Sequence, residues 1–274
     1  MPDQEPFENP ASATRLCEKL LQQWDPMFSE TVDPTRMRRM DEILHVLSAH
    51  FRGSFRVLDL GSGPGPLTLR ILRRFPKSRV VAVDTDPVLV RIGEEALHRF
   101  GRRATWVLAD LREKDWSAEL PVHRFDAAVS SLALHWLHEQ EIRGIYRDLR
   151  RLLRPGGLLV NGDYLPSREP GNQPSSSRSS ADLQREIKGR RARVQAFKSE
   201  WEAWWGELER EPSMRAVLRE RRVRIPGKIP PRRTTGPRVA VSLEAHERAL
   251  RDAGFRETTV SWQDRGFRVL KGIR

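Results

Sequence analysis

The sequence has very little cysteine, because Cys17 is the single thiol in 274 residues. One cysteine cannot form a disulfide framework within the chain, and it excludes a zinc site built on thiolates. A lone thiol also fits a protein of a reducing compartment, where disulfides are rare. We therefore expect a cytoplasmic protein that is held together by its hydrophobic core.

Long hydrophobic runs are missing as well. No window approaches the roughly 18 uninterrupted apolar residues of a membrane span. The first ten residues, MPDQEPFENP, have neither the basic start nor the apolar core of a secretion signal. Hydrophobic residues make up 38% of the chain and charged residues 31%, and the mean hydropathy is −0.61. We expect no membrane partner, and one large domain or a domain with an insertion.

Lysine is scarce among the basic residues. Of 49 basic residues only seven are Lys and 42 are Arg, and the formal net charge is +12. Residues 167–238 contain 18 basic and 9 acidic residues, a net charge of +9, so most of the excess lies in one segment. This segment is either an Arg-rich solvated insertion, as coding bias in a GC-rich genome would produce, or a face that binds a polyanion such as nucleic acid.

Short apolar runs alternate with amphipathic stretches from Ser54 to Leu165. The runs RVLDL, RVVAVD, ATWVLAD, FDAAVSS and GGLLVNGDY predict buried strands. Helices are predicted between them at Pro64–Phe75, Asp86–Phe100 and Gln140–Leu153. This alternation predicts an α/β fold with right-handed crossovers and a parallel sheet.

The flanking segments predict further elements. Asp33 and Pro34 are a typical helix start, and the stripe Met37, Met40, Ile43, Leu44 and Leu47 is expected to pack on the sheet. Residues 166–181 have the Pro/Ser/Gly composition of a flexible linker. Apolar residues from Leu183 to Leu208 then recur at helical spacing and end in a tryptophan cluster. The closing segment predicts a helix from Ser242 to Gly254, followed by ETTVSW and FRVLKGI as an antiparallel hairpin.

Three alternate glycines follow the first predicted strand. Gly61, Gly63 and Gly65 stand directly behind Asp59, where glycine permits tight turns and a close approach of the backbone to a ligand. Asp84 ends the second strand, 23 residues after Gly61, where its carboxylate can accept both hydroxyls of a ribose. Asp110 ends the third strand and can accept from an exocyclic amine such as that of adenine.

The glycine spacing argues against a dinucleotide. The NAD fingerprint is G-x-G-x-x-G, whereas this loop is G-x-G-x-G with Pro64 and Pro66 interleaved. A carboxylate at Asp59 would repel a pyrophosphate and would suit a ligand with an ammonium group or another positive charge. These features favour S-adenosylmethionine, and an NAD-dependent dehydrogenase remains a minor alternative.

Five segments in order resemble the signature segments of the class I S-adenosylmethionine-dependent methyltransferases: VLDLGSGPGPLT, VVAVDTDP, WVLADL, FDAAVSSLALHWL and LLRPGGLLV. The resemblance covers roughly Leu44 to Leu165. It implies a Rossmann-like seven-stranded sheet, mostly parallel with an antiparallel C-terminal hairpin strand, and a helical insertion after the fifth strand. It also implies S-adenosyl-L-methionine as cofactor, S-adenosyl-L-homocysteine as product, and no metal.

The resemblance assigns roles around the cofactor. Asp59 and the glycine loop would contact the methionine part, Asp84 the ribose, and Asp110 with Leu111 the adenine, while Ser130 or Ser131 would lie under the sulfonium. The implied cofactor-binding residues are Asp59, Gly61, Ser62, Gly63, Gly65, Asp84, Thr85, Asp110, Leu111 and Ser130. Residues 1–53 would be an N-terminal helical segment over the cofactor site, residues 54–165 and 242–274 the methyltransferase core, and residues 166–241 a basic, partly flexible helical cap.

The segment LALHWL, residues 132–137, follows the fourth strand, where substrate and cofactor would meet. It resembles the same segment of small-molecule and carboxylate O-methyltransferases. His135 would then act as a general base, bind a carboxylate, or only pack beside Trp136. Tyr164, at the end of the fifth strand, is a second catalytic candidate. The candidates for substrate contact are Trp24, Trp136, Trp201 and Trp205, for which ordinary core packing is the alternative.

We expect in-line methyl transfer to a small molecule, with anionic ones among the candidates. A hydroxyl or carboxylate oxygen is the preferred acceptor, and nitrogen is the alternative. One alternative is an RNA or protein methyltransferase that uses the basic insertion, and another is a non-catalytic module that binds S-adenosylmethionine. The tetrapeptide Asn/Asp-Pro-Pro-aromatic is absent after the fourth strand, which argues against methylation of nucleobase amines. Cys17 is far from any strand end, which argues against cytosine C5 chemistry. The chain is expected to be a monomer or a homodimer.

Overall fold

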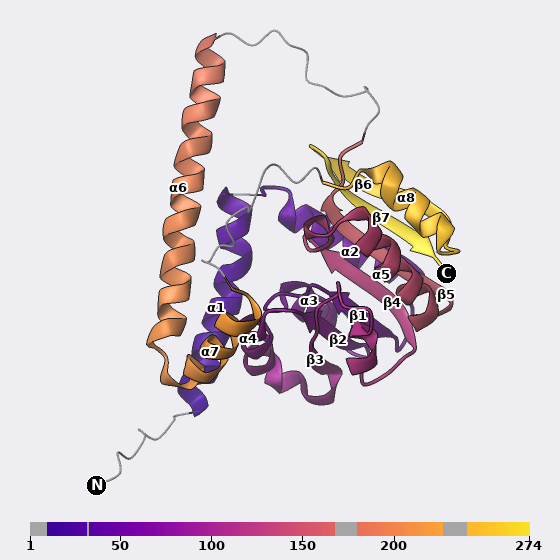
Figure 1. The fold of residues 1–274 in the computed structure, drawn as a ribbon, viewed down its shortest axis with the longest axis horizontal. Coiled ribbons are helices and arrows are strands. Elements are labelled where there is room, and N and C mark those ends of the chain that lie inside the picture. The colour runs from indigo at the N-terminus through magenta and orange to yellow at the C-terminus, as the bar shows by residue number, and fades with distance from the viewer. Residues whose placement is uncertain (1–9, 32, 168–179, 227–239) are drawn as a thin grey trace.

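The computed structural model describes residues 10–31, 33–167, 180–226 and 240–274, which form a central sheet between layers of helices (Figure 1). The sheet formed by these residues has seven strands in the order β3-β2-β1-β4-β5-β7-β6. Strands β1 to β5 pair in parallel, and β7 pairs antiparallel with both β5 and β6. The predicted Rossmann-like sheet with an antiparallel C-terminal hairpin is therefore confirmed.

The strands follow the apolar runs of the sequence. Those in the middle of the sheet are buried on both faces because helices cover both sides, which is why their residues do not alternate between apolar and polar. The strands are β1 (Arg56–Leu60), β2 (Arg79–Asp84), β3 (Ala104–Leu108), β4 (Phe125–Ser131), β5 (Leu153–Tyr164), β6 (Arg256–Asp264) and β7 (Phe267–Ile273).

The C-terminal hairpin turns at Arg265 and Gly266. Both residues have positive φ, 50° and 86°, as the turns that match the twist of two-residue hairpins require. A Cβ on Gly266 would lie 2.8 Å from the Tyr164 ring, so only glycine fits. The Leu165 N–H donates to the Gly266 carbonyl at 2.9 Å. The turn therefore holds the end of β5 in place.

Helices cover both faces of the sheet. On one face the core joins strand residues such as Val57 to α2 (Arg36–His50), α3 (Pro66–Arg74) and α4 (Pro87–Leu97). On the other face, Leu58 and its neighbours pack against α5 (Glu139–Leu152) and α8 (Leu243–Asp252). Three 3₁₀ turns lie in the connections: η1 (His98–Arg103), η2 (Trp116–Glu119) and η3 (Leu134–Trp136).

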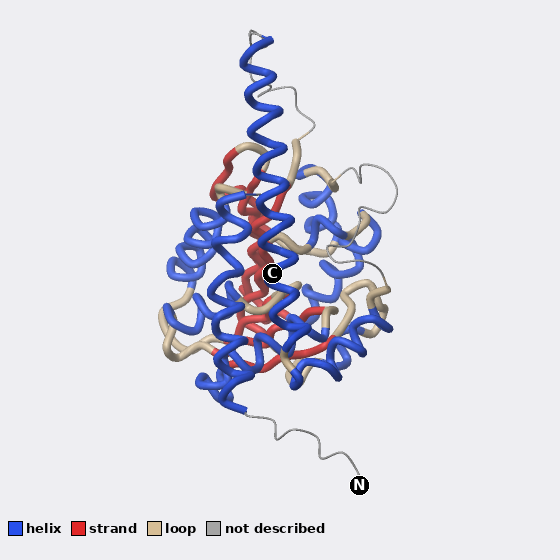
Figure 2. Tube along the Cα trace, turned by 90° about the vertical axis from the view of Figure 1, so that its left-hand side faces the viewer, coloured by secondary structure: helices blue, strands red, loops and turns tan. Residues whose placement is uncertain are grey.

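An outer layer is built from the N-terminal helix and the insertion. α1 (Pro10–Thr31) packs against α4, and α6 (Ser180–Arg210) runs along α1 and projects beyond the sheet at its N-terminal end (Figures 1 and 2). The insertion ends in η4 (Pro212–Met214) and α7 (Arg215–Arg224). Trp24 of α1 lies 5.3 Å from Trp204 of α6, and the Trp204 indole donates to the Leu20 carbonyl at 3.0 Å. Aromatic packing therefore attaches the insertion to the body.

Two details around α2 differ from the sequence prediction. The helix begins at Arg36 rather than at Pro34, because the Asp33 carboxylate accepts from the Thr35 N–H at 3.1 Å in a local turn before the helix. Met37 is 38% exposed and does not belong to the buried stripe. Its thioether instead accepts from Arg70 Nη2 at 3.3 Å.

Other boundaries shift by one or two residues. β1 ends at Leu60, as the run RVLDL predicts, whereas β3 ends at Leu108, two residues before Asp110, where the run ATWVLAD ends. Most of the predicted linker at residues 166–181, namely 168–179, lies outside the described residues. Among the helices that the structure describes, none is long and apolar enough to cross a membrane.

Candidate active site

The glycine loop joins β1 to α3 in the conformation that its residues require. Gly61, Gly63 and Gly65 all have positive φ, at 64°, 56° and 90°, and Ser62 between them is buried. A Cβ on Gly61 would lie 2.3 Å from the Cβ of Ala133, in the segment that follows β4. The loop therefore touches the segment that carries His135, so the two predicted parts of the site are neighbours.

Two acids lie beside this loop at the carboxyl ends of adjacent strands. Asp59 of β1 is 1% exposed and accepts from the Thr68 hydroxyl of α3 at 2.6 Å. Asp84 of β2 accepts from the Gly63 N–H at 2.7 Å and from the Asp86 N–H at 2.9 Å. Burial raises the pKa of Asp59 to about 7, against the Thr68 hydrogen bond and with the help of the Asp84 charge. Burial also raises the pKa of Asp84 to about 6, against its backbone hydrogen bonds.

These carboxylates need a cationic or hydrogen-bond-donating partner. Each is costly to keep ionised where it lies, and each disfavours the charge of the other. A ligand with an ammonium group and hydroxyl donors would satisfy both, whereas a phosphate would add repulsion. The carboxylates beside the loop therefore suit a positively charged nucleoside better than a dinucleotide.

The residues predicted around an adenine are less clearly prepared. Asp110 lies in the loop after β3, and its carboxylate accepts from Arg112 Nε at 2.9 Å and from Arg112 Nη2 at 2.5 Å. The Arg112 hydrogen bonds, opposed by burial, lower the pKa of Asp110. Leu111 packs partly buried against the core, and Thr85 is half-buried after β2. An adenine contact for Asp110 stays a prediction, and it requires Asp110 to share its carboxylate with Arg112.

Ser130 is a strand residue with a bond of its own. It is fully buried in β4, and its hydroxyl donates to the Leu60 carbonyl of β1 at 3.0 Å. The hydroxyl of the following Ser131 is also buried, and it has no hydrogen-bond partner among the described residues. Of the two serines named for the place under the sulfonium, Ser131 is thus the one with an unused hydroxyl.

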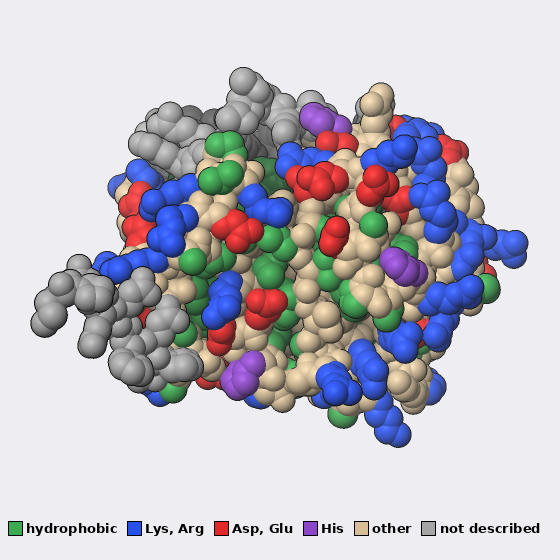
Figure 3. Space-filling view, turned by 60° about the horizontal axis from the view of Figure 1, so that its bottom comes forward, with side chains coloured by type: hydrophobic (Ala, Val, Ile, Leu, Met, Phe, Trp, Pro, Cys, Tyr) green, Lys and Arg blue, Asp and Glu red, His purple; other side chains and the backbone are tan. Residues whose placement is uncertain are grey.

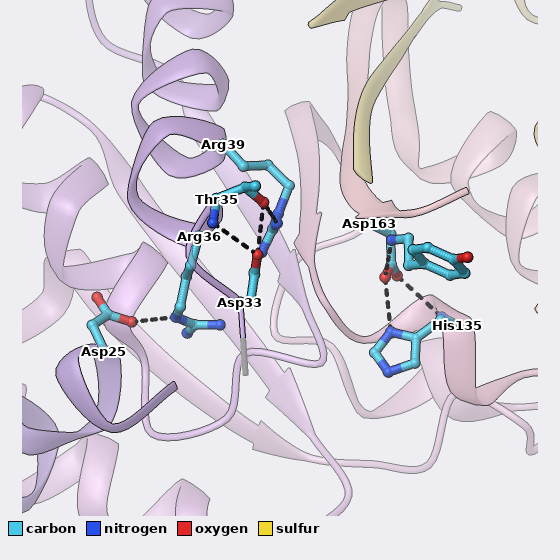
Figure 4. Close-up of polar contacts among 8 residues, drawn as sticks. Asp25, Asp33, Thr35, Arg36, Arg39, His135 and Asp163 are labelled. Carbon is cyan, nitrogen blue, oxygen red and sulfur yellow. Dashed lines mark hydrogen bonds and ion pairs between the residues drawn. The ribbon is translucent and has the colours of Figure 1, made fainter. Parts of the chain in front are cut away.

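His135 is paired with a carboxylate that the sequence analysis missed. In η3, the His135 ring Nδ1 lies 2.7 Å from Asp163 Oδ1, and the His135 backbone N–H donates to Asp163 Oδ2 at 3.0 Å (Figure 4). Asp163 is fully buried near the end of β5 and also accepts from the Tyr164 N–H at 2.8 Å. Its only sequence signal was its place at the end of an apolar strand run, GGLLVNGDY.

The pair fixes the ring of His135. Burial alone would raise the pKa of Asp163, but the His135 charge and the hydrogen bonds lower it, so Asp163 is an ionised acceptor. Nδ1 of His135 therefore carries a proton. Burial opposes protonation of His135, yet the Asp163 charge and the Asp163 hydrogen bond together outweigh it and raise the pKa of His135. The other ring nitrogen, Nε2, has no hydrogen-bond partner among the residues that the structure describes, and 24% of the side chain is exposed.

The aromatic residues predicted to contact the substrate lie in different places. Trp136 lies 4.9 Å from His135 and is 49% exposed, and Tyr164 is 41% exposed beside Phe267. Trp24 lies over Gly63, whose Cβ position is 3.6 Å from its ring. Trp24, Trp201 and Trp205 are all buried in the cluster between α1 and α6, which favours the core alternative for these three.

Buried ion pairs before and within α2 were also missed from sequence. Asp33 accepts from Arg39 Nη2 at 2.5 Å, and Asp25 accepts from Arg36 Nε at 2.7 Å (Figure 4). Asp25 also accepts from Arg70 at 2.9 Å. The three guanidinium groups face two carboxylates, which leaves a net charge of +1. The Arg39 charge opposes protonation of His135, so this positive cluster acts on the His135–Asp163 pair.

The part of the chain that the structure describes also has two cavities and a surface on which charges of both signs are mixed. A cavity of about 620 Å³ lies beyond β3, between the residues 108–119 and Arg224 of α7, and one of about 310 Å³ lies between α4 and Trp106. No group of three or more His, Cys, Asp or Glu among the described residues is arranged to hold a metal ion. On the face in Figure 3, basic side chains lie among acidic ones over much of the centre.

Comparison with known proteins shows what part of the chain is similar to. Residues 57–157 match a family model described as "Methyltransferase domain". A trans-aconitate 2-methyltransferase of Azoarcus sp. (strain BH72) is 36% identical over 104 residues, which are 38% of this chain and 37% of the relative. A malonyl-[acyl-carrier protein] O-methyltransferase of Halorhodospira halophila is 34% identical over 134 residues, 47% of this chain and 40% of the relative.

Residues 57–157 are a methyltransferase domain of the class I S-adenosylmethionine-dependent kind. The solved structure of the S-adenosylmethionine-dependent methyltransferase SibL in its apo form covers 88% of the chain, and the chain covers 56% of it. The TM-score is 0.54 at 15% identity, a likeness of fold. The matches to the two curated relatives span well under half of their lengths.

The methyltransferase family implies S-adenosylmethionine as cofactor, and the residues present fit it. Asp59 is buried and Asp84 half-buried, and neither carboxylate has a cationic partner among the described residues. A Cβ at Gly61 or at Gly65 would clash with Ala133 or with Trp106. The methyltransferase core thus offers a carboxylate to an ammonium group and another to ribose hydroxyls. The individual contacts of these residues stay predictions.

Proposed function

We propose that this protein transfers the methyl group of S-adenosylmethionine to an oxygen atom of a small carboxylic acid. The observation that carries the proposal is the His135–Asp163 pair, which leaves Nε2 of an oriented imidazole at the edge of the sheet that bears the glycine loop. A polar group at this place can meet an acceptor oxygen next to the cofactor.

Two further features support a carboxylate acceptor. The two relatives above are named for trans-aconitate and for malonyl-[acyl-carrier protein], both of which carry carboxylate groups. The pKa of His135 is raised, so an imidazolium is available near neutral pH to donate from Nε2 to a carboxylate. The positive cluster of Arg36, Arg39 and Arg70 adds a favourable potential for an anion.

The chain's own residues would position the reactants. S-adenosylmethionine supplies, when bound, a methyl group on a positively charged sulfur that an oxygen nucleophile can displace in line. Asp59 would hold the ammonium group and Asp84 the ribose hydroxyls. The close approach of Gly61 to Ala133 would exclude water from the space between these groups and the sheet. His135 would orient the acceptor oxygen, with Asp163 keeping the ring in one tautomer.

A hydroxyl acceptor is the second candidate, and the same pair favours it because Asp163 makes neutral His135 a stronger base. The two candidates predict opposite pH dependences. A carboxylate acceptor needs protonated His135, so kcat/KM falls as pH rises through a pKa above the ordinary value of about 6.5. A hydroxyl acceptor needs the neutral ring, so kcat/KM rises through the same pKa.

The test uses a panel of di- and tricarboxylic acids and hydroxylated aromatic acids with methyl-labelled S-adenosylmethionine. For a methyl ester, mild alkali releases the label as volatile methanol, whereas a methyl ether keeps it. We expect alkali-labile product. Alkali-stable product would favour the hydroxyl candidate, and transfer only to amines, protein or RNA would overturn the proposal.

The variant His135→Gln tests the role of the His135–Asp163 pair. For a carboxylate acceptor we expect a roughly 10- to 100-fold loss of kcat/KM, the value of a charged hydrogen bond, loss of the pH dependence, and unchanged affinity for S-adenosylhomocysteine. His123→Gln is the matched control, because His123 is exposed in the loop before β4. Equal kinetics for both variants would return His135 to packing beside Trp136.

A further inference from the structure

One arginine of the insertion is buried in the body of the protein. Arg221 of α7 is 6% exposed, donates from Nε to Asp86 Oδ2 at 2.5 Å, and lies 4.7 Å above the Trp205 ring. Arg219 and Arg222 on the same helix are exposed. Burying a guanidinium and a carboxylate together costs solvation, so an apolar pair would serve attachment alone at least as well. The pair therefore calls for a role beyond attachment.

The partner of Arg221 is tied to the cofactor loop. Asp86 caps α4 by accepting from the Val88 N–H at 3.0 Å, and its own N–H donates to Asp84 Oδ1 at 2.9 Å. Asp84 Oδ2 in turn accepts from the Gly63 N–H at 2.7 Å. An unbroken series of polar contacts thus runs from Arg221 in the insertion through Asp86 and Asp84 to Gly63.

The helix also lies over the ends of the strands that the ribose and adenine are expected to contact. Arg224, one turn after Arg221, lines the 620 Å³ cavity together with Leu108 and Ala109. Leu108 pairs with Asp84 in the sheet. α7 therefore contacts the N-cap of α4, two residues after β2, and reaches the end of β3.

We propose that Arg221 is a positioning residue that couples docking of α7 to binding of the adenosyl cofactor. When the pair is formed, the Arg221 charge balances the charge of Asp86, and the Asp86 N–H donates to one oxygen of Asp84. Asp84 then presents a fixed carboxylate to the ribose. With the pair broken, an unpaired Asp86 charge faces Asp84 and the end of β2 is free to shift. The inference rests on the proposed position of the ribose at Asp84.

The first experiment measures S-adenosylhomocysteine affinity and dissociation rate for the full chain and its variants. Arg221→Met is expected to weaken affinity about 5- to 150-fold, the usual range of coupling between sites, mostly through faster dissociation. The matched control is Arg222→Met, which removes an exposed charge from the same helix and should stay within about twofold of the unaltered protein. Arg221→Lys keeps the charge without the planar fork and is expected to fall between them.

The second experiment needs no variant. Coupling is reciprocal, so saturating S-adenosylhomocysteine must slow hydrogen exchange of the α7 amides, residues 215–224, in the unaltered protein. The slowing should be lost in Arg221→Met. A pair that serves only attachment would leave exchange in α7 indifferent to the ligand.

The outcomes separate this inference from the proposed function. If Asp84→Ala loses affinity while α7 exchange ignores the ligand, Arg221 serves only attachment and the ribose assignment stands. If Asp84→Ala binds S-adenosylhomocysteine normally, the ribose assignment fails and the inference fails with it. If Arg221→Met does not fold, Arg221→Lys and the exchange of the unaltered protein decide in the same way.

Discussion

Asp59 is buried and Asp84 half-buried at the ends of adjacent strands, and the protonation state of both carboxylates depends on what binds between them. Without a cation, burial raises the pKa values to about 7 and about 6, so both are partly protonated near neutral pH. A bound ammonium group favours the ionised forms and lowers both values again. Ligand binding must then release protons in the range below about pH 7.

Calorimetry at pH 6 in two buffers of different ionisation enthalpy tests this directly. We expect proton release when S-adenosylhomocysteine binds, and an affinity that rises from about pH 5.5 to about pH 7.5, by at most tenfold per pH unit for each proton released. Asp59→Asn should reduce the release, whereas Asp41→Asn, an exposed acid on α2, should not. An affinity that falls as pH rises would contradict the assignment of Asp59 to a cationic group.

The indole of Trp106 on β3 packs directly against two glycines, Gly65 and Gly93, and the packing of β3 against α4 depends on them. The Cβ positions of Gly65 and Gly93 lie 2.5 Å and 2.1 Å from the Trp106 ring. Gly65, with its φ of 90°, ends the cofactor loop, so the indole that fills this space also supports the start of α3. Packing between two elements thus determines the identity of residues in a third.

Gly93→Ala is expected to lower the free energy of unfolding by ~1–3 kcal/mol through overpacking, measured by urea denaturation. Trp106→Phe in the same chain should restore part of the loss by shortening the ring. The matched control is Gly144→Ala in α5, where no atom lies within 4 Å of the added Cβ. That change should stabilise the protein by ~0.5–1 kcal/mol, because alanine favours the helix. Equal effects of the two alanines would refute the packing argument.

The molecule as a whole is a methyltransferase core with an outer layer of α1, α6 and α7. The outer layer joins the core through the tryptophans between α1 and α6 and through the Arg221–Asp86 pair. The remainder of α6 projects outward, where side chains such as Val194 are 61% exposed (Figure 2). Attachment of the insertion is therefore concentrated at one end of α6.

Trp204→Ala should show this concentration. Trp204 is 2% exposed, and its loss is expected to cost ~3–5 kcal/mol in the free energy of unfolding. Hydrogen exchange should quicken over residues 201–210 much more than in β1 and β4. Val194→Ala, on the exposed part of the same helix, should change stability by less than ~0.5 kcal/mol. Equal acceleration in the central strands would mean that core and insertion unfold as one unit.

Local chemistry by itself predicted most of the fold and the place of the glycine loop beside Asp59 and Asp84. Apolar runs bounded by Gly and Pro predict the strands of a doubly covered sheet, and an acid before three alternate glycines predicts the loop at its edge. The residues of each feature lie within a few positions of one another in the sequence, so their spacing is enough to predict their local geometry. The helix start at Pro34 was wrong, because Asp33 accepts from the Thr35 N–H in a turn before the helix. The stripe position of Met37 was wrong as well, because its thioether contacts Arg70 instead of the core.

Only the tertiary structure decided the partners of the predicted residues. Asp163 is 28 residues from His135, and Asp86 is 135 residues from Arg221. Neither pairing has a sequence signal, because a buried carboxylate at a strand end and one arginine among 42 are ordinary until the chain folds. Burial and short distance make these groups significant, since a charge removed from water must find its counter-charge wherever the fold brings one.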